Sequence, residues 1–316
     1  MTDKNCCLAL DVGGTNIIAG LMDEKGKILE RRKIPTLSAR GSGRVIEDML
    51  LNLEDLARRC PGRGRAGALA IGVPGWINKS EGMLIQAPNL PGWKEIPLAS
   101  IISKALGLPV FLENDTNLYA LGEWLYGVGR GLDNVLVITL GTGVGGGLIL
   151  EKRLWNGSFA SAVEIGHTLV EENGALCGCG RRGCLETVAS ATGMARLGRI
   201  WLEEGRPTLY QGRPEDLTPQ LMFELAGRGD KMSLYVFEKA GQALGRVAVD
   251  VCNLLGLEGV IVGGGAAGAF KYIRPSMWSV LAEGLIITHP ERIKLLKGVL
   301  DEDAPLHGAV ALIGGY

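Results

Sequence analysis

The feature of this sequence that most constrains its fold is an arrangement that occurs twice. An apolar strand-like run, a glycine turn and a second apolar run follow one another at residues 8–22 and again at 134–150. Within it, residues 8–15 correspond to residues 135–143. A unit that repeats at this distance indicates two domains built alike. We therefore expect two similar domains that face each other, and 316 residues suffice for both.

Glycine turns that directly follow apolar strands favour a phosphate-binding protein. The chain has 48 glycines in 316 residues, about twice the average usage of roughly 7%. A single such turn is often an ordinary hairpin, but three of them with backbone N–H groups open to a ligand are typical of phosphate sites. Asp11, before the first turn, is placed to reach Mg²⁺ or its water ligands. The turns consist of Gly13, Gly14, Thr15 and Asn16; of Gly141, Thr142 and Gly143; and of Gly263, Gly264 and Gly265.

Two glycine motifs leave a nicotinamide-dependent dehydrogenase open as an alternative. Residues 141–146 satisfy the G-x-G-x-x-G pattern, but a strand follows them where a dinucleotide site needs a helix. Residues 263–268 also satisfy it, late in the chain and without the βαβ unit of such a site. The Walker A pattern is absent, which excludes a P-loop enzyme.

The remaining hydrophobic pattern predicts an α/β protein. Residues 74–93 are rich in glycine, proline and asparagine and are predicted to form a loop. Thr218 and Pro219 are typical of a helix N-cap and first helical position. The spacing of apolar residues predicts helices over 44–59, 96–106, 219–226, 234–255 and 307–313, and strands over 27–34, 69–73, 110–112 and 259–262.

Three polar residues, Glu113, Asn114 and Asp115, follow the predicted strand 110–112. In an open α/β sheet, ligands bind beyond the carboxyl ends of the strands. A carboxylate at that place can accept the proton of a substrate hydroxyl, as phosphoryl transfer to an alcohol requires. Taken alone, an Asn-Asp pair is more often a turn or a helix cap.

One histidine and three cysteines predict a zinc site. His167 precedes Cys177, Cys179 and Cys184, and glycines separate the cysteines. These four ligands complete a tetrahedral zinc shell with no open position, so the zinc would be structural. The metal would also hold the nearby carboxylates of Glu164 and Glu186 rigidly, as acceptors for sugar hydroxyls. Buried, reduced cysteines and a zinc-ribbon nucleic-acid module are alternatives, but the segment is not basic enough for the latter.

Composition narrows the class of partner. The formal net charge is −1 and the pI about 6.4, which favours neither nucleic acid nor an anionic membrane as partner. No apolar run is long enough for a membrane helix, and no signal peptide is evident. The odd count of seven cysteines, three of them clustered, indicates metal binding in a reducing compartment rather than a set of disulfides. We therefore expect a cytoplasmic protein.

Together these motifs resemble the ROK family of sugar kinases and related repressors over nearly the whole chain. The segments that carry the resemblance are 11–15, 113–115, 141–147, 164–167 and 177–186. The resemblance implies an α/β, actin-like ATPase fold in which two ribonuclease-H-like domains close over a cleft. The smaller domain would comprise residues 1–115 and about 301–316. Residues 116–300 would form the larger domain, with the zinc site and a dimer surface.

The resemblance also implies site roles. Asp115 would be the catalytic base, and Asn114, Glu164, His167 and Glu186 would bind sugar hydroxyls. The turns at 13–15 and 141–143 would flank the phosphates of MgATP, and Gly264 and Gly265 would lie near the adenosine. His167 would bind both the zinc, with Cys177, Cys179 and Cys184, and the sugar.

The implied reaction is phosphorylation of a hexose by ATP, with glucose as the first acceptor to consider and a homodimer or homotetramer as the assembly. N-acetylglucosamine, N-acetylmannosamine, fructose, mannose and allose stay open as acceptors, and polyphosphate stays open as donor. A sugar-sensing regulator without catalysis is the alternative of another class.

Two differences from the family pattern bear on this interpretation. Residues 158–163, before Glu164, lack the glycines that the family usually has there, which affects the expected sugar preference. The repressors of the family carry a DNA-binding helix-turn-helix before the first glycine turn, whereas ten residues precede Asp11 here. We therefore expect a kinase rather than a repressor.

Overall fold

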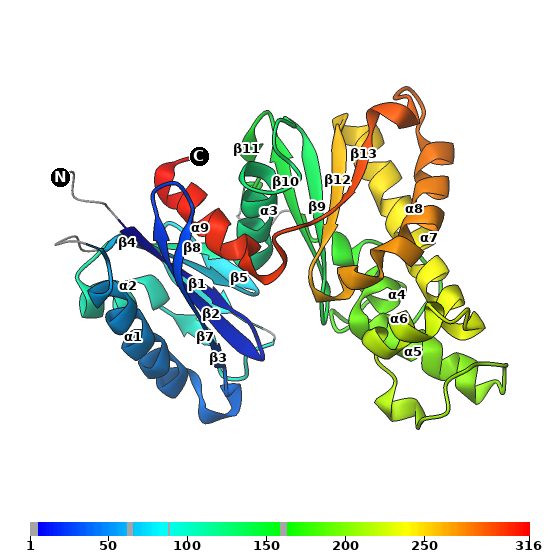
Figure 1. Cartoon of the computed structure of the whole chain (residues 1–316), viewed down its shortest axis with the longest axis horizontal. Helices are drawn as coiled ribbons and strands as arrows, with labels where there is room; N and C mark the ends of the chain where they lie inside the picture. The colour runs from blue at the N-terminus through cyan, green and yellow to red at the C-terminus, as the bar shows by residue number, and fades with distance from the viewer. Residues whose placement is uncertain (1–5, 62–65, 88, 159–162) are drawn as a thin grey trace.

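The computed structural model describes residues 6–61, 66–87, 89–158 and 163–316. Two five-stranded sheets dominate it, and they share one topology (Figure 1). In each, three antiparallel strands are extended on one side by two parallel strands. The first sheet has the order β3 (Ile28–Pro35), β2 (Asn16–Asp23), β1 (Cys6–Val12), β4 (Ala66–Val73) and β8 (Val110–Asn114). The second has the order β11 (Arg153–Leu154), β10 (Val144–Leu150), β9 (Val135–Leu140), β12 (Gly259–Gly263) and β13 (Lys294–Lys297). The predicted duplication is thus confirmed.

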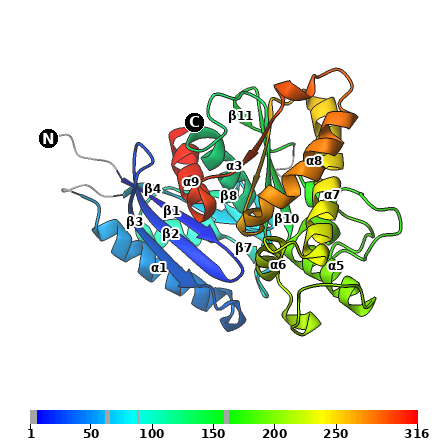
Figure 2. The same cartoon turned by 45° about the vertical axis from the view of Figure 1, so that its right-hand side comes forward.

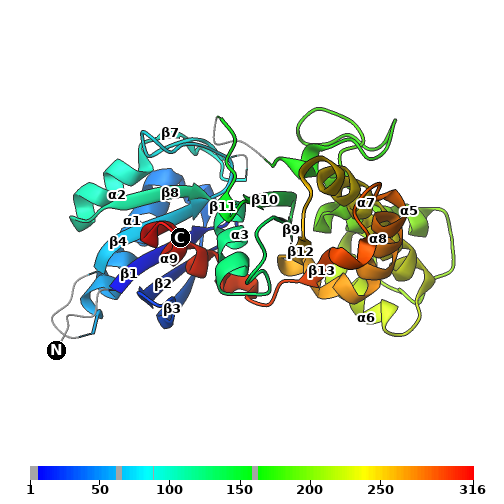
Figure 3. The ribbon, with the colours of Figure 1, turned by 90° about the horizontal axis from the view of Figure 1, so that it is seen from above.

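The helices form layers on both faces of these sheets. The helices are α1 (Ser42–Arg58), α2 (Leu98–Leu106), α3 (Asp115–Leu125), α4 (Glu186–Ala189), α5 (Ala191–Glu203), α6 (Pro219–Ala226), α7 (Lys231–Leu255), α8 (Phe270–Gly284) and α9 (Ala304–Gly314). Helices α1 and α2 cover the outer face of the first sheet, and α7 and α8 that of the second (Figure 2). Helices α3 and α9 lie between the sheets (Figure 3) and share one hydrophobic core with both. No helix in the described ranges has the length and hydropathy needed to cross a membrane.

The alternation of side chains along β1 determines which face each residue meets. Leu8 and Leu10 pack toward α1, whereas Cys7 and Ala9 pack toward α3 and α9. Asp11 follows Ala9 at the same period of two, so its carboxylate is on the α3 face. The strand pattern therefore directs the first predicted site residue into the space between the sheets.

Three expectations from the sequence were wrong or incomplete. The predicted loop 74–93 contains strands β5 (Trp76–Asn78) and β6 (Met83–Gln86), which pair with β7 (Lys94–Ile96) in a small third sheet. The reason is burial: Leu84 and Trp93 pack into the core below α2. Helix α3 was not predicted, because it is buried nearly all round and so lacks an amphipathic stripe.

The third correction concerns the cysteines. The structure joins Cys6 of β1 to Cys60, just after α1, in a disulfide, whereas the sequence suggested no disulfides. The two residues are far apart in sequence, and their pairing depends on α1 packing back across β1. Cys177, Cys179 and Cys184, the predicted metal ligands, form no disulfide.

The contact between α3 and α9 leaves no space for a side chain at two glycines. A Cβ atom added at Gly122 would overlap the carbonyl oxygen of Ala304, and one at Gly308 would overlap that of Leu118. Two helices can approach this closely only where small residues meet the facing backbone. The pair of glycines therefore sets the distance between these helices.

We expect Gly308→Ala to lower the free energy of unfolding by about 1–3 kcal/mol, because overpacking forces backbone shifts. Gly314→Ala is the matched control on the same helix, since an added Cβ there meets nothing within 4 Å. Urea unfolding followed by circular dichroism measures both variants. Equal stability of the two variants would contradict the close-contact explanation.

Candidate active site

Asp11 and Asp115 meet where three parallel strands of the first sheet end. Asp11 of β1 is paired with Gly72 of β4, and Gly72 with Glu113 of β8. A Cβ atom added at Gly72 would lie 3.3 Å from Asp11 Oδ1 and 3.4 Å from Asp115 Cα. The absence of a side chain at Gly72 therefore allows Asp11 and the start of α3 to approach each other.

Asp115 is the first residue of α3, and Asn114 is its N-cap. The side-chain oxygen of Asn114 accepts hydrogen bonds from the backbone N–H groups of Thr116 (2.9 Å) and Asn117 (3.3 Å). Asp115 Oδ1 accepts one from the backbone N–H of Thr116, at 2.8 Å. The helix start thus fixes the predicted base and its neighbour. The sequence left open whether the Asn-Asp pair is a helix cap or part of a site. The structure shows that Asn114 is a helix cap and that Asp115 lies at the candidate site.

The two aspartates repel each other. Burial, the Asp115 carboxylate and then Glu302 raise the pKa of Asp11 to about 8. Burial also raises the pKa of Asp115, while its hydrogen bonds from Thr116 oppose the rise. Because two half-buried carboxyl groups lie together at one strand edge, binding of a proton or a cation between them is favourable.

The first two glycine turns are closed by backbone hydrogen bonds and expose further backbone amides. The backbone N–H of Gly13 donates to the Asn16 carbonyl at 2.9 Å, and that of Gly141 to Gly143 at 2.9 Å. Among the described residues, none accepts a hydrogen bond from the N–H groups of Gly14, Thr15 or Thr142. All three of these residues are exposed, so their amides are free for a ligand.

The third glycine turn lies beside the second. β12 runs parallel to β9, and Gly263 is paired with Thr139 just before the second turn. Gly264 has a left-handed backbone (φ 84°), and a Cβ atom added to it would lie 2.6 Å from the Leu140 carbonyl oxygen. Its N–H already donates to the hydroxyl of Tyr119, at 3.2 Å. Gly265 is exposed, and an added Cβ there would meet nothing within 4 Å.

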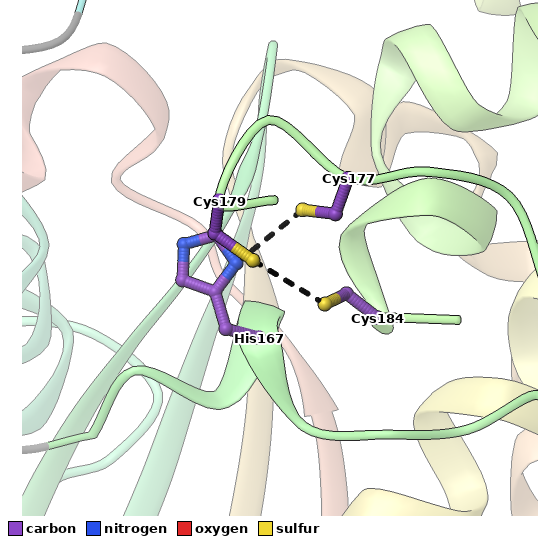
Figure 4. Close-up of side chains that lie close together, drawn as sticks. All are labelled: His167, Cys177, Cys179 and Cys184. Atoms are coloured by element: carbon purple, nitrogen blue, oxygen red, sulfur yellow. Dashed lines mark hydrogen bonds between the residues drawn. The ribbon is translucent and has the colours of Figure 1, made fainter. Parts of the chain in front are cut away.

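The structure brings the four predicted zinc ligands together (Figure 4). Their ligand atoms all lie within 4.8 Å of one another. His167 Nδ1 is 3.6 Å from Cys177 Sγ, and Cys179 Sγ is 3.7 Å from Cys184 Sγ. A tetrahedral zinc with Zn–S bonds of about 2.3 Å has S–S edges of about 3.8 Å. The spacing and the S₃N donor set therefore fit zinc.

The backbone around these ligands is shaped for the cluster. The N–H of Gly180 donates to the Cys177 carbonyl at 2.9 Å, closing a turn around the first two cysteines. Gly180 has φ 85°, a conformation that favours glycine. Hydrogen bonds from Arg181 lower the pKa of Cys179 to about 6, which favours the thiolate form that binds metals.

Glu186 connects the cluster of His167 and the three cysteines to the second glycine turn. Its Oε1 lies 3.7 Å from Cys177 Sγ, and its Oε2 accepts a hydrogen bond from the Val144 N–H at 3.1 Å. A Cβ atom at Gly143 would overlap Oε2. The glycine therefore makes room for this carboxylate.

Glu164 belongs to the same group of side chains. Partial burial raises the pKa of this otherwise exposed residue; His167 opposes the rise, and Asp115 and Glu186 add to it. The charges of the Asp115 and Glu186 carboxylates therefore both act on Glu164. Of the segment 158–163 with its unusual composition, residues 159–162 lie outside the described residues.

Sequence reasoning missed a buried network next to this site. Glu113 is 1% exposed and forms an ion pair with Lys79. Its Oε1 accepts hydrogen bonds from the Asn114 N–H and from Asn117 Nδ2, both at 2.9 Å, and Asn117 Nδ2 also donates to Asn156 Oδ1 at 2.9 Å. Glu113 is paired with Gly72 and contacts Asn117 of α3. The motif at 113–115 gave the only signal for this residue.

Comparisons with known proteins agree with this geometry. The model of the ROK family matches residues 7–315. A glucokinase from Thermotoga maritima is 34% identical over 97% of this chain and 96% of its own length. An N-acetylmannosamine kinase from Yersinia pestis is 35% identical over 84% of this chain and 85% of its own.

Solved structures are similar over the same extent. A ROK family glucokinase from Streptomyces griseus, in complex with glucose and AMPPNP, superimposes with a TM-score of 0.81 at 31% identity, over 98% of this chain and 99% of that one. Such ROK sugar kinases have the actin-like ATPase fold, which confirms the predicted fold class.

We expect Asp11→Asn to stabilise the ligand-free protein at pH 8 and to have little effect near pH 4. The folded protein holds the Asp11 proton up to a pKa of about 8, whereas the unfolded chain releases it near about 3.9. Stability associated with this proton is therefore present at low pH and lost as the pH rises toward 8.

Thermal unfolding from pH 4 to pH 9 without Mg²⁺ measures this effect. Asp250→Asn, at an exposed position of α7, is the control. A difference between Asp11→Asn and the parent protein that is the same at every pH would mean that Asp11 ionises normally.

Proposed function

The chain belongs to the ROK family, and on that premise we propose that it transfers the γ-phosphoryl group of ATP to a hexose hydroxyl, with glucose as the acceptor. The observation that carries the proposal is the half-buried Asp115 at the strand end next to Asp11, whose charge also raises the pKa of Glu164. A base, a cation site and hydroxyl acceptors are thus side by side. The glucokinases among the relatives support glucose as the acceptor.

Asp115 is proposed as the base. Burial raises its pKa, which makes the carboxylate a better proton acceptor than an exposed aspartate. The hydrogen bond from Thr116 fixes the Oδ1 atom. The other oxygen is then the one to receive the proton of the attacking hydroxyl.

Sugar hydroxyls would be held by Asn114, Glu164, His167 and Glu186. In His167 the Nδ1 atom faces the cysteines, which leaves Nε2 for a hydroxyl. Glu186 presents one oxygen to Val144 and the other toward Cys177. Correct positioning of the acceptor matters most here, because a loose phosphoryl-transfer transition state demands little covalent chemistry from the protein.

The phosphates of ATP would lie along the free amides of the two turns at Gly14–Thr15 and Thr142. Asp11 would hold Mg²⁺ or its waters, and the ion would neutralise the phosphate charge and relieve the repulsion from Asp115. Gly265 is open to the adenosine side, whereas the Gly264 N–H is already engaged by Tyr119. The complex of the Streptomyces griseus glucokinase with AMPPNP supports ATP as the donor.

Zinc bound by His167, Cys177, Cys179 and Cys184 would be structural. When bound, the ion supplies cross-links between segments that have little regular structure. It would thereby fix His167 directly and Glu186 through its contact with Cys177. A cytoplasmic location and a homodimeric or homotetrameric state complete the proposal, both from the sequence analysis. The clustered cysteines support a reducing compartment, whereas the Cys6–Cys60 disulfide does not.

N-acetylmannosamine is the second candidate acceptor. The observation that favours it is the Yersinia kinase, which is as similar to this chain as the glucokinases are. The two acceptors differ at the second carbon, and the fold does not distinguish between them.

A coupled ADP-release assay with MgATP and a panel of hexoses and N-acetylhexosamines tests the function. We expect turnover with glucose. Asp115→Asn should lower kcat by about 100- to 10,000-fold, the usual contribution of general base catalysis, with glucose affinity largely retained. Asp250→Asn is the control.

Three results would contradict this. Near-normal kcat in Asp115→Asn would remove Asp115 as the base. Turnover with N-acetylmannosamine but not with glucose would make N-acetylmannosamine the acceptor. No turnover with any sugar of the panel, by folded and zinc-loaded protein, would favour a sugar sensor.

Cys179→Ser should lose zinc and weaken glucose binding, because His167 and Glu186 lose their fixed positions. Metal analysis by mass spectrometry and calorimetric titration with glucose measure the two effects. Cys252→Ala, at a free cysteine of α7 outside the cluster, is the control. Unchanged glucose affinity in a zinc-free variant would refute the supporting role of the metal.

A further inference from the structure

Helix α3 presents a stripe of three polar residues toward the second half of the molecule. Asp115, Tyr119 and Glu123 are spaced four residues apart, which places them on one face of the helix. Asp115 lies at the candidate active site. Tyr119 is 6% exposed and Glu123 is not exposed at all, so the second and third members need partners inside the protein.

The partner of Tyr119 is the third glycine turn. Its hydroxyl accepts a hydrogen bond from the Gly264 N–H at 3.2 Å. A Cβ atom at Gly263 would overlap this hydroxyl, and one at Gly298 would lie 3.0 Å from it. Burial raises the pKa of Tyr119 to about 12, so the hydroxyl stays neutral. Gly263, Gly264 and Gly298 therefore surround the Tyr119 hydroxyl oxygen closely.

The partners of Glu123 are the two chain segments that connect the sheets beyond α3. One carboxylate oxygen accepts hydrogen bonds from the Val299 and Leu300 N–H groups, both at 2.8 Å, in the connection from β13 to α9. The other accepts one from the Val128 N–H at 3.3 Å, in the connection from α3 to β9. Glu123 thus fastens both connections to the end of the helix that begins with Asp115.

We propose that Tyr119 is a positioning residue for the nucleotide: it fixes the Gly263–Gly265 turn relative to the helix that starts with the catalytic base. This inference rests on the proposed kinase function, because it takes that turn as part of the ATP site. Gly264 has a backbone conformation open almost only to glycine, and a turn of this kind is mobile unless something holds it. The Tyr119 hydroxyl holds it before the nucleotide arrives, and Glu123 keeps the far end of α3 in place.

The consequence is a link between the two substrates that runs along one helix. α3 is a rigid element, so a shift of the glycine turn and a shift of Asp115 are coupled. When the turn is already ordered, nucleotide binding does not have to pay the entropy of ordering it, so the affinity for the nucleotide rises without a new contact.

Tyr119→Phe removes only the hydroxyl, and Tyr126→Phe, at the other end of the same helix, is the matched control. Calorimetric titration with MgADP should show roughly 3- to 10-fold weaker binding in Tyr119→Phe, the net effect of one buried hydrogen bond. In the coupled assay the KM for ATP should rise by a similar factor. Glucose binding, measured without nucleotide, should match that of the parent protein, as should Tyr126→Phe in every measurement.

Hydrogen exchange gives a readout that requires no substrate. The segment around Gly264 should exchange faster in Tyr119→Phe than in the parent protein, while the melting temperature falls by only a few degrees, the cost of one buried hydrogen bond. Unchanged exchange and unchanged MgADP affinity would overturn the inference, as would an equal loss of glucose and MgADP affinity, which indicates general loosening. A parent protein that binds no MgADP would instead refute the kinase function, and the inference with it.

Discussion

The close contact of α3 with α9 is the constraint on which the rest of this structure depends. These helices fill the space between two sheets of equal topology, and both sheets share a core with them. Gly122 and Gly308 allow the helix backbones to meet. Because α3 begins at the carboxyl end of β8, its position fixes Asp115 with respect to both sheets. The contact between the helices thereby determines where chemistry can occur.

The site combines two methods of holding side chains. On the first sheet, hydrogen-bonded strand ends and a helix start position Asp11, Asn114 and Asp115. On the other side, residues 164–186 contain only short helical turns and isolated β-bridges, and a metal bound by the four candidate ligands would supply the order that a sheet otherwise gives. Glu186 belongs to both, since it touches a cysteine of the cluster and the backbone of a glycine turn.

Much of this arrangement could be predicted from the sequence, because it depends on local patterns. The repeated strand and glycine turn revealed the duplicated sheet, and the Thr218 cap was found at the residue where the structure has it. Helix α3 was missed because burial on all sides removes the helical period. Lys79 and Asn156 gave no signal, since their partners, Glu113 and Asn117 respectively, come near only in the folded chain. The division at residues 115 and 301 stays a prediction.

The cap of α3 has a consequence for how a substrate hydroxyl is oriented. Two backbone N–H groups occupy the side-chain oxygen of Asn114, so toward a ligand this residue offers only its NH₂ group. Asp115 as a carboxylate can only accept. A hydroxyl between them must take its hydrogen bond from Asn114 and give its own hydrogen to Asp115. With the proposed roles of Asn114 and Asp115, the polarity of the helix start would select the one hydroxyl rotamer in which the proton already points at the proposed base.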